Sequence, residues 1–522
     1  MKSYLVSALA AALIIMDFSG QAQSPAPATS TEKYRPAFHF TPRKNWINDP
    51  NGLVYYDGEY HLFYQYNPQG NRWGHMSWGH AVSKDLLHWN ELPVALNEFA
   101  NPDGKSVTMI FSGSAVIDYG NTSKLCPTGT KDCMVAIYTS HVDEKGKALA
   151  QHQSLAYSTD KGRTWQQYAK NPVLELNTNE FRDPNVFWYE PQKKWIMAAV
   201  KPDEYSVLFF ESKDLKSWKQ MSRFGKQGDQ SKIWECPSLI QVPILNEPGK
   251  SRWVLFISSG HRQEGYVGMQ YFVGDFDGTN FKLDQENPKP ASAEWGNVVD
   301  YGKDYYAAIP YNNLPASQKR PVMMGWINNW EYANDLPTEP FKGAMSLPRE
   351  IALKRTPEGL TLIQQPKISG LRNQVRFQQK SLSLNNTSQV VSEVTSSPFE
   401  LEVTLVPGQA ESQGIRLYKD GSEETVLFYQ NGKIQLDRRK SGNVSFHQRF
   451  PSVEEAPGTL QNGAIKLRLI ADASVLEVYV NDGEAVLTDL VFPEKTTGQM
   501  ELFTKGGTGE FKDLKISSLT AK

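Results

Sequence analysis

Three separate segments of the chain share one pattern, in which an acidic residue comes just before a proline and a run of strand-like apolar residues. The segments are residues 46–52 with Asp49, residues 181–188 with Asp183, and residues 234–240 with Glu235. The Asn-Asp-Pro and Asn-Gly steps of the first segment are typical of turns, and a nearby Asp-Gly step between aromatic-rich runs predicts a β-hairpin. For one such acid taken alone, the alternative is that its side chain forms an Asx-turn and only starts a strand. Because the pattern occurs three times, we expect the acids to converge on one pocket.

Strands and turns recur from about residue 38 to residue 348 without convincing long helices. Similar segments that each end in an aromatic residue resemble hairpins between outer strands of a repeated sheet, and they occupy residues 83–89, 158–165, 212–218 and, more weakly, 275–281. The first strands of the units would begin near residues 51, 112, 184, 236 and 301, which gives five units of roughly fifty to seventy residues. Five units and inward-facing acids favour an all-β fold with a β-propeller over residues 35–350. Two consecutive β-sandwiches are the alternative.

The remainder of the chain predicts a second all-β domain. Residues 351–372 are interpreted as a connector, and period-two alternation with Asn-Gly and Asp-Gly turns then returns, as in residues 399–405 and 475–480. This alternation is typical of a β-sandwich, which we place at residues 373–522. Packing against the propeller is the expected role of this sandwich, and a lectin-like role is the alternative.

The N-terminus has the outline of a secretory signal peptide. A lysine at position 2 is followed by an apolar run over residues 4–16, which is too short for a membrane-spanning helix. We predict a signal peptide over residues 1–22 and a flexible linker over residues 23–34. Export to the periplasm or the medium is the implied route, and no membrane span is expected in the mature chain.

Charge and cysteine content narrow the function classes. The net charge is −2, so there is no electrostatic argument for binding nucleic acid. Cys126 and Cys133 lie in one loop and are able to form a disulfide in an oxidising compartment, whereas Cys236 is interpreted as a packed residue at the pocket floor. The nine histidines form no convincing ligand motif, so we expect neither a metal nor a cofactor.

Together the three acid motifs resemble the signature of glycoside hydrolase family 32, which includes invertases, inulinases, levanases and other β-fructosidases. Further motifs in matching order lie at residues 111–114, 300–308, 325–330 and 345–350, and the resemblance covers about residues 35–350. It implies a propeller of five blades, whose first strands line a central funnel, followed by a C-terminal β-sandwich.

The resemblance also implies roles for the acids. Asp49 is expected to be the nucleophile, Glu235 the acid/base, and Asp183 a stabiliser of the transition state beside Arg182. The setting of each acid agrees with this division, because turn amides around Asp49 favour its charged form and apolar neighbours of Glu235 would raise its pKa. The alternatives are an exposed strand-end acid at position 235 and a structural ion pair between Arg182 and Asp183.

Other residues fall where the family binds the terminal fructose, although each has core packing as an alternative. Trp326 and Trp330 are expected to close the pocket wall, and Asp300 and Tyr301 to contact a second sugar or orient Glu235. The predicted substrate-binding residues are Asn48, Gln65, Trp73, Phe111, Ser112, Arg182 and Trp330.

An aspartate followed by Pro-Asn-Gly in the first motif is similar to exo-acting members and invertases of the family. Residues 328–333 resemble microbial exo-inulinases and levanases more than plant invertases. We therefore expect a secreted retaining hydrolase that releases terminal β-D-fructofuranosyl units from levan or inulin, with sucrose as a further substrate. The alternatives are a fructosyltransferase with the same acids and a non-catalytic fructan-binding protein, and the preferred linkage stays open.

Overall fold

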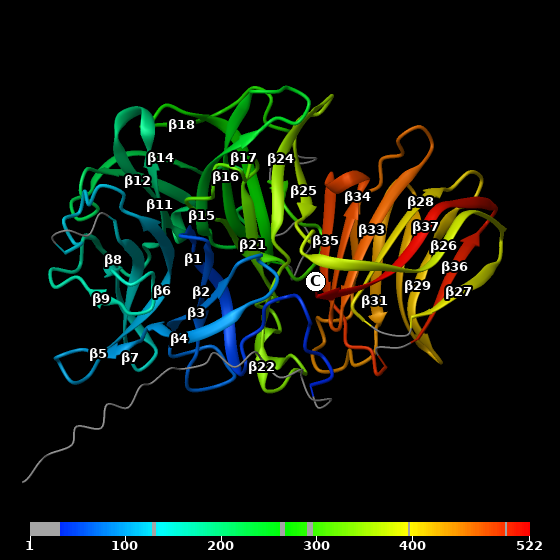
Figure 1. Ribbon diagram of the computed structural model, residues 1–522, viewed down its shortest axis with the longest axis horizontal. Helices are drawn as coiled ribbons and strands as arrows, with labels where there is room; N and C mark the ends of the chain where they lie inside the picture. The colour runs from blue at the N-terminus through cyan, green and yellow to red at the C-terminus, as the bar shows by residue number, and fades with distance from the viewer. Residues whose placement is uncertain are drawn as a thin grey trace, which may run out of the picture. The chain divides into compact units, whose positions relative to one another are not determined.

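The computed structural model describes residues 32–127, 132–260, 267–289, 296–394, 397–495 and 498–521 (Figure 1). The predicted signal peptide and nearly all of the predicted linker lie outside these residues. Tyr34–Lys522 form one compact unit. In the described part of the chain, strands make up almost all regular structure, and no helix is long and apolar enough to cross a membrane. The described helices are short 3-10 turns at Glu190–Gln192, Pro202–Glu204, Ala333–Asp335 and Asn481–Gly483.

Five antiparallel sheets form the blades of the propeller predicted from the sequence. The first contains β1 (Asn45–Tyr56), β2 (Glu59–Tyr66), β3 (Ser77–Ser83), β4 (Asn90–Leu96) and the parallel strand β22 (Phe341–Lys342). The second contains β5 (Phe99–Ala100), β6 (Val107–Ile117), β7 (Met134–Glu144), β8 (Lys147–Ser158), β9 (Gln166–Gln167) and β10 (Leu174–Thr178). The third contains β11 (Arg182–Tyr189), β12 (Lys194–Lys201), β13 (Ser206–Ser212) and β14 (Lys219–Gly225).

The fourth blade contains β15 (Glu235–Pro243), β16 (Ser251–Gly260), β17 (Val267–Phe276), β18 (Phe281–Leu283) and β19 (Asn297–Val298). The fifth contains β20 (Tyr306–Pro310), β21 (Val322–Ile327), β23 (Ala344–Met345), β24 (Arg349–Thr356) and β25 (Gly359–Pro366). The predicted connector is therefore wrong over most of its length, because β24 and β25 complete the fifth blade. The backbone between the two domains is confined to residues 367–370.

The first strands of the blades, β1, β6, β11, β15 and β20, contact one another in this order, and β20 contacts β1 again to close the ring. Apolar side chains fill the space between each pair of neighbouring blades. For example, Phe63 and Trp78 of the first blade pack with Tyr138 of the second, and Ile309 of the fifth packs with Leu62 of the first. Burial of these faces is the main stabilising contribution to the ring.

The repeated Ser-x-Asp segments are turns between the third and fourth positions of a blade, as the sequence predicted. Asp85, Asp160 and Asp214 each accept hydrogen bonds from backbone N–H groups of their own turn. In the first and third of these turns the next residue, Leu86 or Leu215, has a positive φ and is buried. The repeat therefore encodes turn geometry rather than chemistry.

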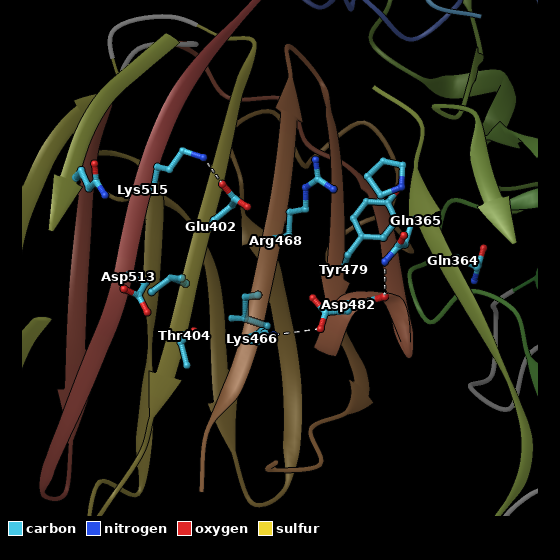
Figure 2. A pocket seen from close by; sticks show the side chains of 14 residues that line it. Gln364, Gln365, Glu402, Thr404, Lys466, Arg468, Tyr479, Asp482, Asp513 and Lys515 are labelled. Atoms are coloured by element: carbon cyan, nitrogen blue, oxygen red, sulfur yellow. Dashed lines mark hydrogen bonds and ion pairs between the residues drawn. The ribbon is translucent and has the colours of Figure 1, made fainter. Parts of the chain in front are cut away.

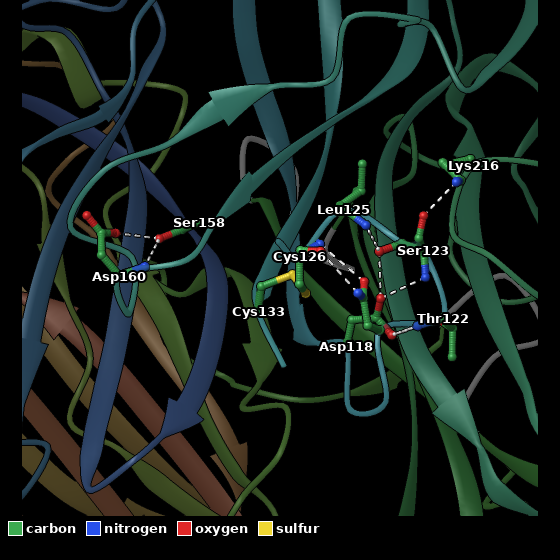
Figure 3. The surroundings of a disulfide bond; sticks show 10 residues. Asp118, Thr122, Ser123, Leu125, Cys126, Cys133, Ser158, Asp160 and Lys216 are labelled. Atoms are coloured by element: carbon green, nitrogen blue, oxygen red, sulfur yellow. Dashed lines mark hydrogen bonds between the residues drawn. A yellow bond between two sulfur atoms is a disulfide. The ribbon is translucent and has the colours of Figure 1, made fainter. Parts of the chain in front are cut away.

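Cys126 and Cys133, for which the sequence left disulfide formation open, are bonded and close the loop between β6 and β7 (Figure 3). Asp118 organises this loop by accepting hydrogen bonds from the backbone and side chains of Thr122 and Ser123. The loop also contacts the third blade, where Lys216 donates to the Ser123 carbonyl. It therefore links the second blade to the third.

The C-terminal sandwich consists of two six-stranded sheets around an apolar core. One contains β26 (Leu371–Asn385), β28 (Phe399–Val406), β33 (Ile465–Asp472), β34 (Val475–Val480), β35 (Ala485–Leu490) and β37 (Thr508–Ala521). The other contains β27 (Ser388–Val394), β29 (Ser412–Asp420), β30 (Glu423–Gln430), β31 (Lys433–Lys440), β32 (Val453–Pro457) and β36 (Gly498–Lys505).

A hollow on the first of these sheets is lined largely by polar side chains (Figure 2). Lys515 pairs with Glu402 at 2.6 Å and Lys466 with Asp482 at 3.2 Å. The one aromatic side chain labelled there, Tyr479, is buried. This surface is a solvated, ion-paired face without an exposed aromatic platform among the labelled residues, so it gives no support to a lectin-like role.

Buried ion pairs join the sandwich to the propeller and to the segment before β1. Arg349 of β24 bonds Asp300 at 2.8 Å and Glu477 of β34 at 3.2 Å. His39 bonds Asp472 at 2.9 Å and the same Glu477 at 3.3 Å. Burial lowers the pKa of His39, but the hydrogen bonds and charges of the two acids outweigh burial and raise this pKa to about 9. At neutral pH the imidazolium thus fixes the N-terminal segment to the sandwich.

We expect this contact to make stability depend on pH. The folded-state pKa of about 9 exceeds the unfolded value of about 6.5, so the contribution of His39 is complete below pH 6.5 and disappears as the pH rises through 9. Its full size is about 3 kcal/mol. The difference in thermal midpoint between the wild type and His39→Gln, measured by calorimetry, should therefore be large at pH 6 and small at pH 10. A difference that grows with pH would contradict this assignment.

Candidate active site

The innermost strand of every blade carries the same irregularity. In each, three residues on the inner strand span the distance of two on its neighbour, between Ile47 and Pro50, Ile110 and Gly113, Arg182 and Asn185, Glu235 and Ser238, and Tyr306 and Ile309. These are β-bulges, which re-aim side chains and often lie beside active sites. All three predicted acids lie at or next to such a bulge. The acid-and-proline pattern therefore marks a bulge in three blades, whereas the bulges at Ile110–Gly113 and Tyr306–Ile309 contain neither an acid nor a proline.

The bulges bring positive φ angles to residues other than glycine. Asp183 has φ 61° and Cys236 has φ 47°. The backbone N–H of Asp183 leaves the sheet ladder and donates to Thr139 Oγ1 at 3.0 Å, and that of Ala307 donates to Ser258 Oγ at 3.0 Å. Hydroxyl groups of neighbouring blades thus satisfy the groups that the bulges release.

Asp49 lies at the floor of the site and is 8% exposed. Its carboxylate accepts hydrogen bonds from Ser112 Oγ at 2.5 Å and Asn48 Nδ2 at 3.0 Å, and the Cys236 thiol lies 3.4 Å away. Trp46 donates to Asn48 Oδ1 at 2.8 Å and so fixes the amide that faces Asp49. The carboxylate is held on several sides before any ligand arrives.

Asp183 and Arg182 connect the floor to the third acid. The backbone N–H of Cys236 donates to Asp183 Oδ2 at 2.9 Å. The Arg182 guanidinium lies 3.1 Å from Glu235 Oε1, and its Nη1 donates to Glu180 at 2.6 Å. Arg182 is thus a buried cation among acids, which is the usual way to hold carboxylates close together.

Glu235 is contacted on both oxygens. Arg182 approaches Oε1, and the Tyr306 hydroxyl donates to Oε2 at 2.9 Å. The Glu235 side chain is 23% exposed, more than those of the other two acids. The sequence suggested an apolar setting from Trp234 and Cys236, but the carboxyl group itself faces a cation and a phenol.

The electrostatics differ from the sequence-based expectation at Asp49. Burial raises the pKa of Asp49, and the charge of Glu235 adds to this, while the hydrogen bond from Ser112 opposes it. Burial also raises the pKa of Asp183 against the attraction of Arg182. Turn amides were expected to favour the charged form of Asp49, but the groups that lower its pKa are the side chains of Ser112, Asn48 and Cys236, and they only partly offset the loss of solvent.

The remaining groups around the acids keep fixed protonation states. Burial opposes the charge of Arg182, but the surrounding acids raise its pKa, so it stays cationic. Burial and the neighbouring acids raise the pKa of the Cys236 thiol and of the Tyr306 hydroxyl well above their usual values. Cys236 is therefore a protonated packing residue, and Tyr306 is a hydrogen-bond donor.

Aromatic side chains stand around the acids. Trp73 is 43% exposed, with its ring edge towards Phe111 at a centroid distance of 6.2 Å. Phe111 in turn stacks on His141 at 4.2 Å. Trp330 is half-buried and packs against Trp46. These rings offer apolar faces of the kind that sugar rings contact.

Two of the residues predicted for the site are buried and contact other residues around it. Gln65 is 2% exposed and donates to Asn51 at 2.9 Å and to the Ile110 carbonyl at 3.0 Å, so it joins the first two blades. Trp326 is fully buried behind Trp330 rather than at the surface of the pocket.

The suggestion that Asp300 contacts a second sugar or orients Glu235 is wrong. Asp300 is 2% exposed and bonds Arg349 and Thr488 at the domain junction, because its turn packs against β35.

Sequence reasoning missed two polar residues of the site. Gln151 of β8 accepts hydrogen bonds from the Phe181 N–H at 2.9 Å and from Arg182 at 3.4 Å, and its amide nitrogen contacts His141 at 3.1 Å. Tyr306 was part of a recognised motif but received no role. Both lie within strands and carry no turn signal, so only the arrangement of blades reveals them.

The floor of the site is closed. Further along the inner strands, a cavity of about 10 Å³ lies between Pro50, Asp183 and Pro237, which is room for about one water molecule. Beyond it, Asn312 donates to the carbonyls of Ala115 at 2.9 Å and Val186 at 3.1 Å. A sugar chain therefore has no passage along the propeller axis.

Comparison with known proteins agrees with this architecture. The profile described as glycosyl hydrolases family 32 N-terminal domain matches residues 39–366, and that of the family 32 C-terminal domain matches residues 367–518. A levanase of Bacillus subtilis is 43% identical over 99% of this chain and 75% of its own length. An extracellular exo-inulinase of Aspergillus awamori is 40% identical over 92% of this chain and 93% of its own length.

The solved structures give the same result. The crystal structure of the exo-inulinase from Aspergillus awamori has a TM-score of 0.85 and 37% identity, over 95% of this chain and 99% of that chain. Both domains are matched in order and nearly over their whole length. The protein is therefore a glycoside hydrolase, and the chain belongs to glycosyl hydrolases family 32.

Proposed function

We propose that the protein is an exported, retaining hydrolase that releases terminal β-D-fructofuranosyl units from levan or inulin, with sucrose as a further substrate. The observation that supports this proposal is the convergence of Asp49, Asp183 and Glu235, which are linked through Cys236 and Arg182. The relatives are a levanase and an exo-inulinase, which supports fructans as the substrate class. The predicted signal peptide over residues 1–22 supports export, and the word extracellular in one relative's name agrees with it.

Asp49 is the proposed nucleophile. Its carboxylate is held by Ser112 and Asn48, so it enters the reaction in one orientation and little reorganisation is needed. One oxygen attacks the anomeric carbon of the fructosyl unit, and the bond to the leaving oxygen breaks as the covalent ester forms. Water then attacks the same carbon and releases fructose with its original configuration.

Glu235 is the proposed acid/base. It gives a proton to the glycosidic oxygen in the first step and takes one from the attacking water in the second. Arg182 and Tyr306 fix its two oxygens, so the same group is correctly placed in both steps. Formation of the ester at Asp49 removes one negative charge from the cluster of acids before the second step.

Asp183 is the proposed stabiliser of the transition state. The Cys236 N–H fixes its orientation, and its strained backbone is held by Thr139. Contacts from this carboxylate to fructose hydroxyl groups accelerate the reaction only if they strengthen as the ring gains positive charge.

We infer exo attack from two features of the site. Asn312 bonds carbonyls of the second and third blades, which leaves little room for a chain along the axis, and aromatic rings lie near the acids; both support entry with the terminal unit first. Hydrolysis rather than transfer agrees with the relatives' names. The transferase and the non-catalytic binder remain outcomes that the experiments below distinguish.

We expect Asp49→Asn and Glu235→Gln each to lower kcat on sucrose by at least about 10³-fold, because each removes a proton-transfer or nucleophilic group while keeping side-chain shape. The measurement is fructose release by purified variants with thermal midpoints close to that of the wild type. Glu190→Gln, which alters an exposed acid on a 3-10 turn, is the matched control and should retain activity. Full activity in either site variant would remove the assignment.

Ser112→Ala should shift the pH dependence in a defined direction. The Ser112 hydrogen bond lowers the pKa of Asp49, so its loss raises this pKa further. Because the nucleophile must be ionised, the acidic limb of the kcat/KM profile should move upward by about one pH unit. A downward shift would contradict the role of Ser112.

Product analysis tests the exo mode. Incubation with levan, inulin and sucrose, followed by chromatography, should give fructose alone from the earliest times on the fructans. A ladder of oligosaccharides would mean endo attack, and products longer than the substrate at high sucrose would mean transfer. Tight fructan binding without any sugar release would favour the non-catalytic alternative.

A further inference from the structure

We propose that Arg438, in the C-terminal sandwich, is a positioning residue for the fructose pocket and acts through Tyr332 on Trp330 and Trp46. The inference rests on the proposed function, since substrate binding is its main readout. It assigns the sandwich a part in substrate binding, carried by one side chain of β31.

Arg438 is fully buried and reaches from the sandwich to the fifth blade. It donates to Tyr332 from Nη2 at 2.8 Å and to Asp304 from Nη1 at 2.5 Å. The Tyr332 hydroxyl also donates to the same aspartate. Arginine, tyrosine and aspartate therefore form a closed triangle in which each group fixes the other two.

The sandwich also surrounds the Tyr332 ring. Phe450 lies 5.5 Å from this ring between centroids, and the Arg438 guanidinium lies 4.2 Å above Phe450. Tyr332 is 1% exposed. Both the ring and the hydroxyl of Tyr332 are thus held by residues of the other domain.

Tyr332 belongs to the short loop that carries Trp330. This loop is tied internally, because the Tyr332 N–H donates to the Asn329 carbonyl at 3.0 Å and the Asn329 side chain donates to the Lys303 carbonyl at 2.8 Å. Glu331 adds contacts to Lys232 at 3.1 Å and Arg449 at 3.5 Å. The position of Trp330 therefore depends on the groups that hold residues 329–332.

From Trp330 the contacts continue to the nucleophile. Trp330 packs on Trp326 at 4.8 Å and on Trp46 at 6.0 Å. Trp46 donates to Asn48 at 2.8 Å, and Asn48 donates to Asp49 at 3.0 Å. A displaced loop would thus disturb both the aromatic wall and the amide beside Asp49.

Two variants separate this role from general stability. Tyr332→Phe keeps the buried ring and removes only the hydroxyl, and Arg438→Lys keeps the charge but cannot bond Tyr332 and Asp304 with the same fork. We expect each to raise KM for sucrose at least about fivefold, with kcat within about twofold of the wild type. Leu427→Ala, which creates a cavity in the sandwich core, is the control for stability. Its thermal midpoint should fall while its KM for sucrose stays unchanged.

A double-mutant cycle gives the decisive measurement. In a Trp330→Ala background, Tyr332→Phe should change KM less than twofold, because the residue through which it acts is gone. An equal fivefold effect in that background, an unchanged KM in both single variants, or a matching KM increase in Leu427→Ala would overturn the proposal.

Calorimetric titration with fructose separates this proposal from the proposed reaction. If the wild type binds fructose but releases none from any fructan or sucrose, the proposed reaction fails, and the same cycle is then read from the Kd for fructose. If the wild type is active and the cycle is additive, the proposed route from Arg438 through Tyr332 to Trp330 fails while the proposed reaction stands.

Discussion

The extra residue in the innermost strand of every blade is the feature on which the site depends. A strand presents alternate residues to opposite faces, so an uninterrupted strand cannot direct two consecutive side chains to one funnel. The bulge breaks this alternation at Asn48 and Asp49, at Asp183, and beside Glu235. Proline suits the position because it has no N–H to leave unpaired. The same β-bulge, present in the innermost strands of separate blades, therefore directs the acids towards one another.

Convergence has an electrostatic cost that the surrounding structure must offset. Asp49 and Asp183 are buried close to Glu235, and each charge disfavours the others. Arg182 is the cation that touches Glu235, and Gln151 and Glu180 hold Arg182 in place. The apolar contacts between blades supply the stability that permits this arrangement. The cluster of buried acids is thus electrostatically unfavourable by itself, and the packing of the five blades stabilises it.

The sequence allowed prediction of the parts of this design that have local signals. The acids were identified because a bulge containing proline is visible in a few residues, and the repeat was identified because Asp85 and Asp214 each organise a turn of similar sequence. Gln151, His141 and Tyr306 were not assigned roles, since each lies within a strand and acts on a group in a different segment.

Two of the errors involve contacts between segments that are distant in sequence. Asp300 begins one of the further motifs matched to the family, but its partner Arg349 lies 49 residues away in the chain. The strands β24 and β25 were interpreted as a connector because the fifth blade is interrupted by the loop that carries Trp330. The contact of Asp300 with Arg349 and the pairing of β24 with β21 are distant in sequence, whereas the hairpin of β24 and β25 is itself local.

The chain forms two domains, but the C-terminal sandwich also contacts the propeller segment that leads to the acids. Backbone hydrogen bonds join Tyr301 to Val486 at 2.7 Å and Asp304 to Thr488 at 3.1 Å, so β35 holds the segment that leads into β20. An added Cβ at Gly302 would lie 2.2 Å from the Thr488 nitrogen, which leaves no room for a side chain. Two residues after Asp304, Tyr306 donates to Glu235. The sandwich therefore lies one chain segment away from Glu235, and its buried ion pairs help to set the geometry around this residue.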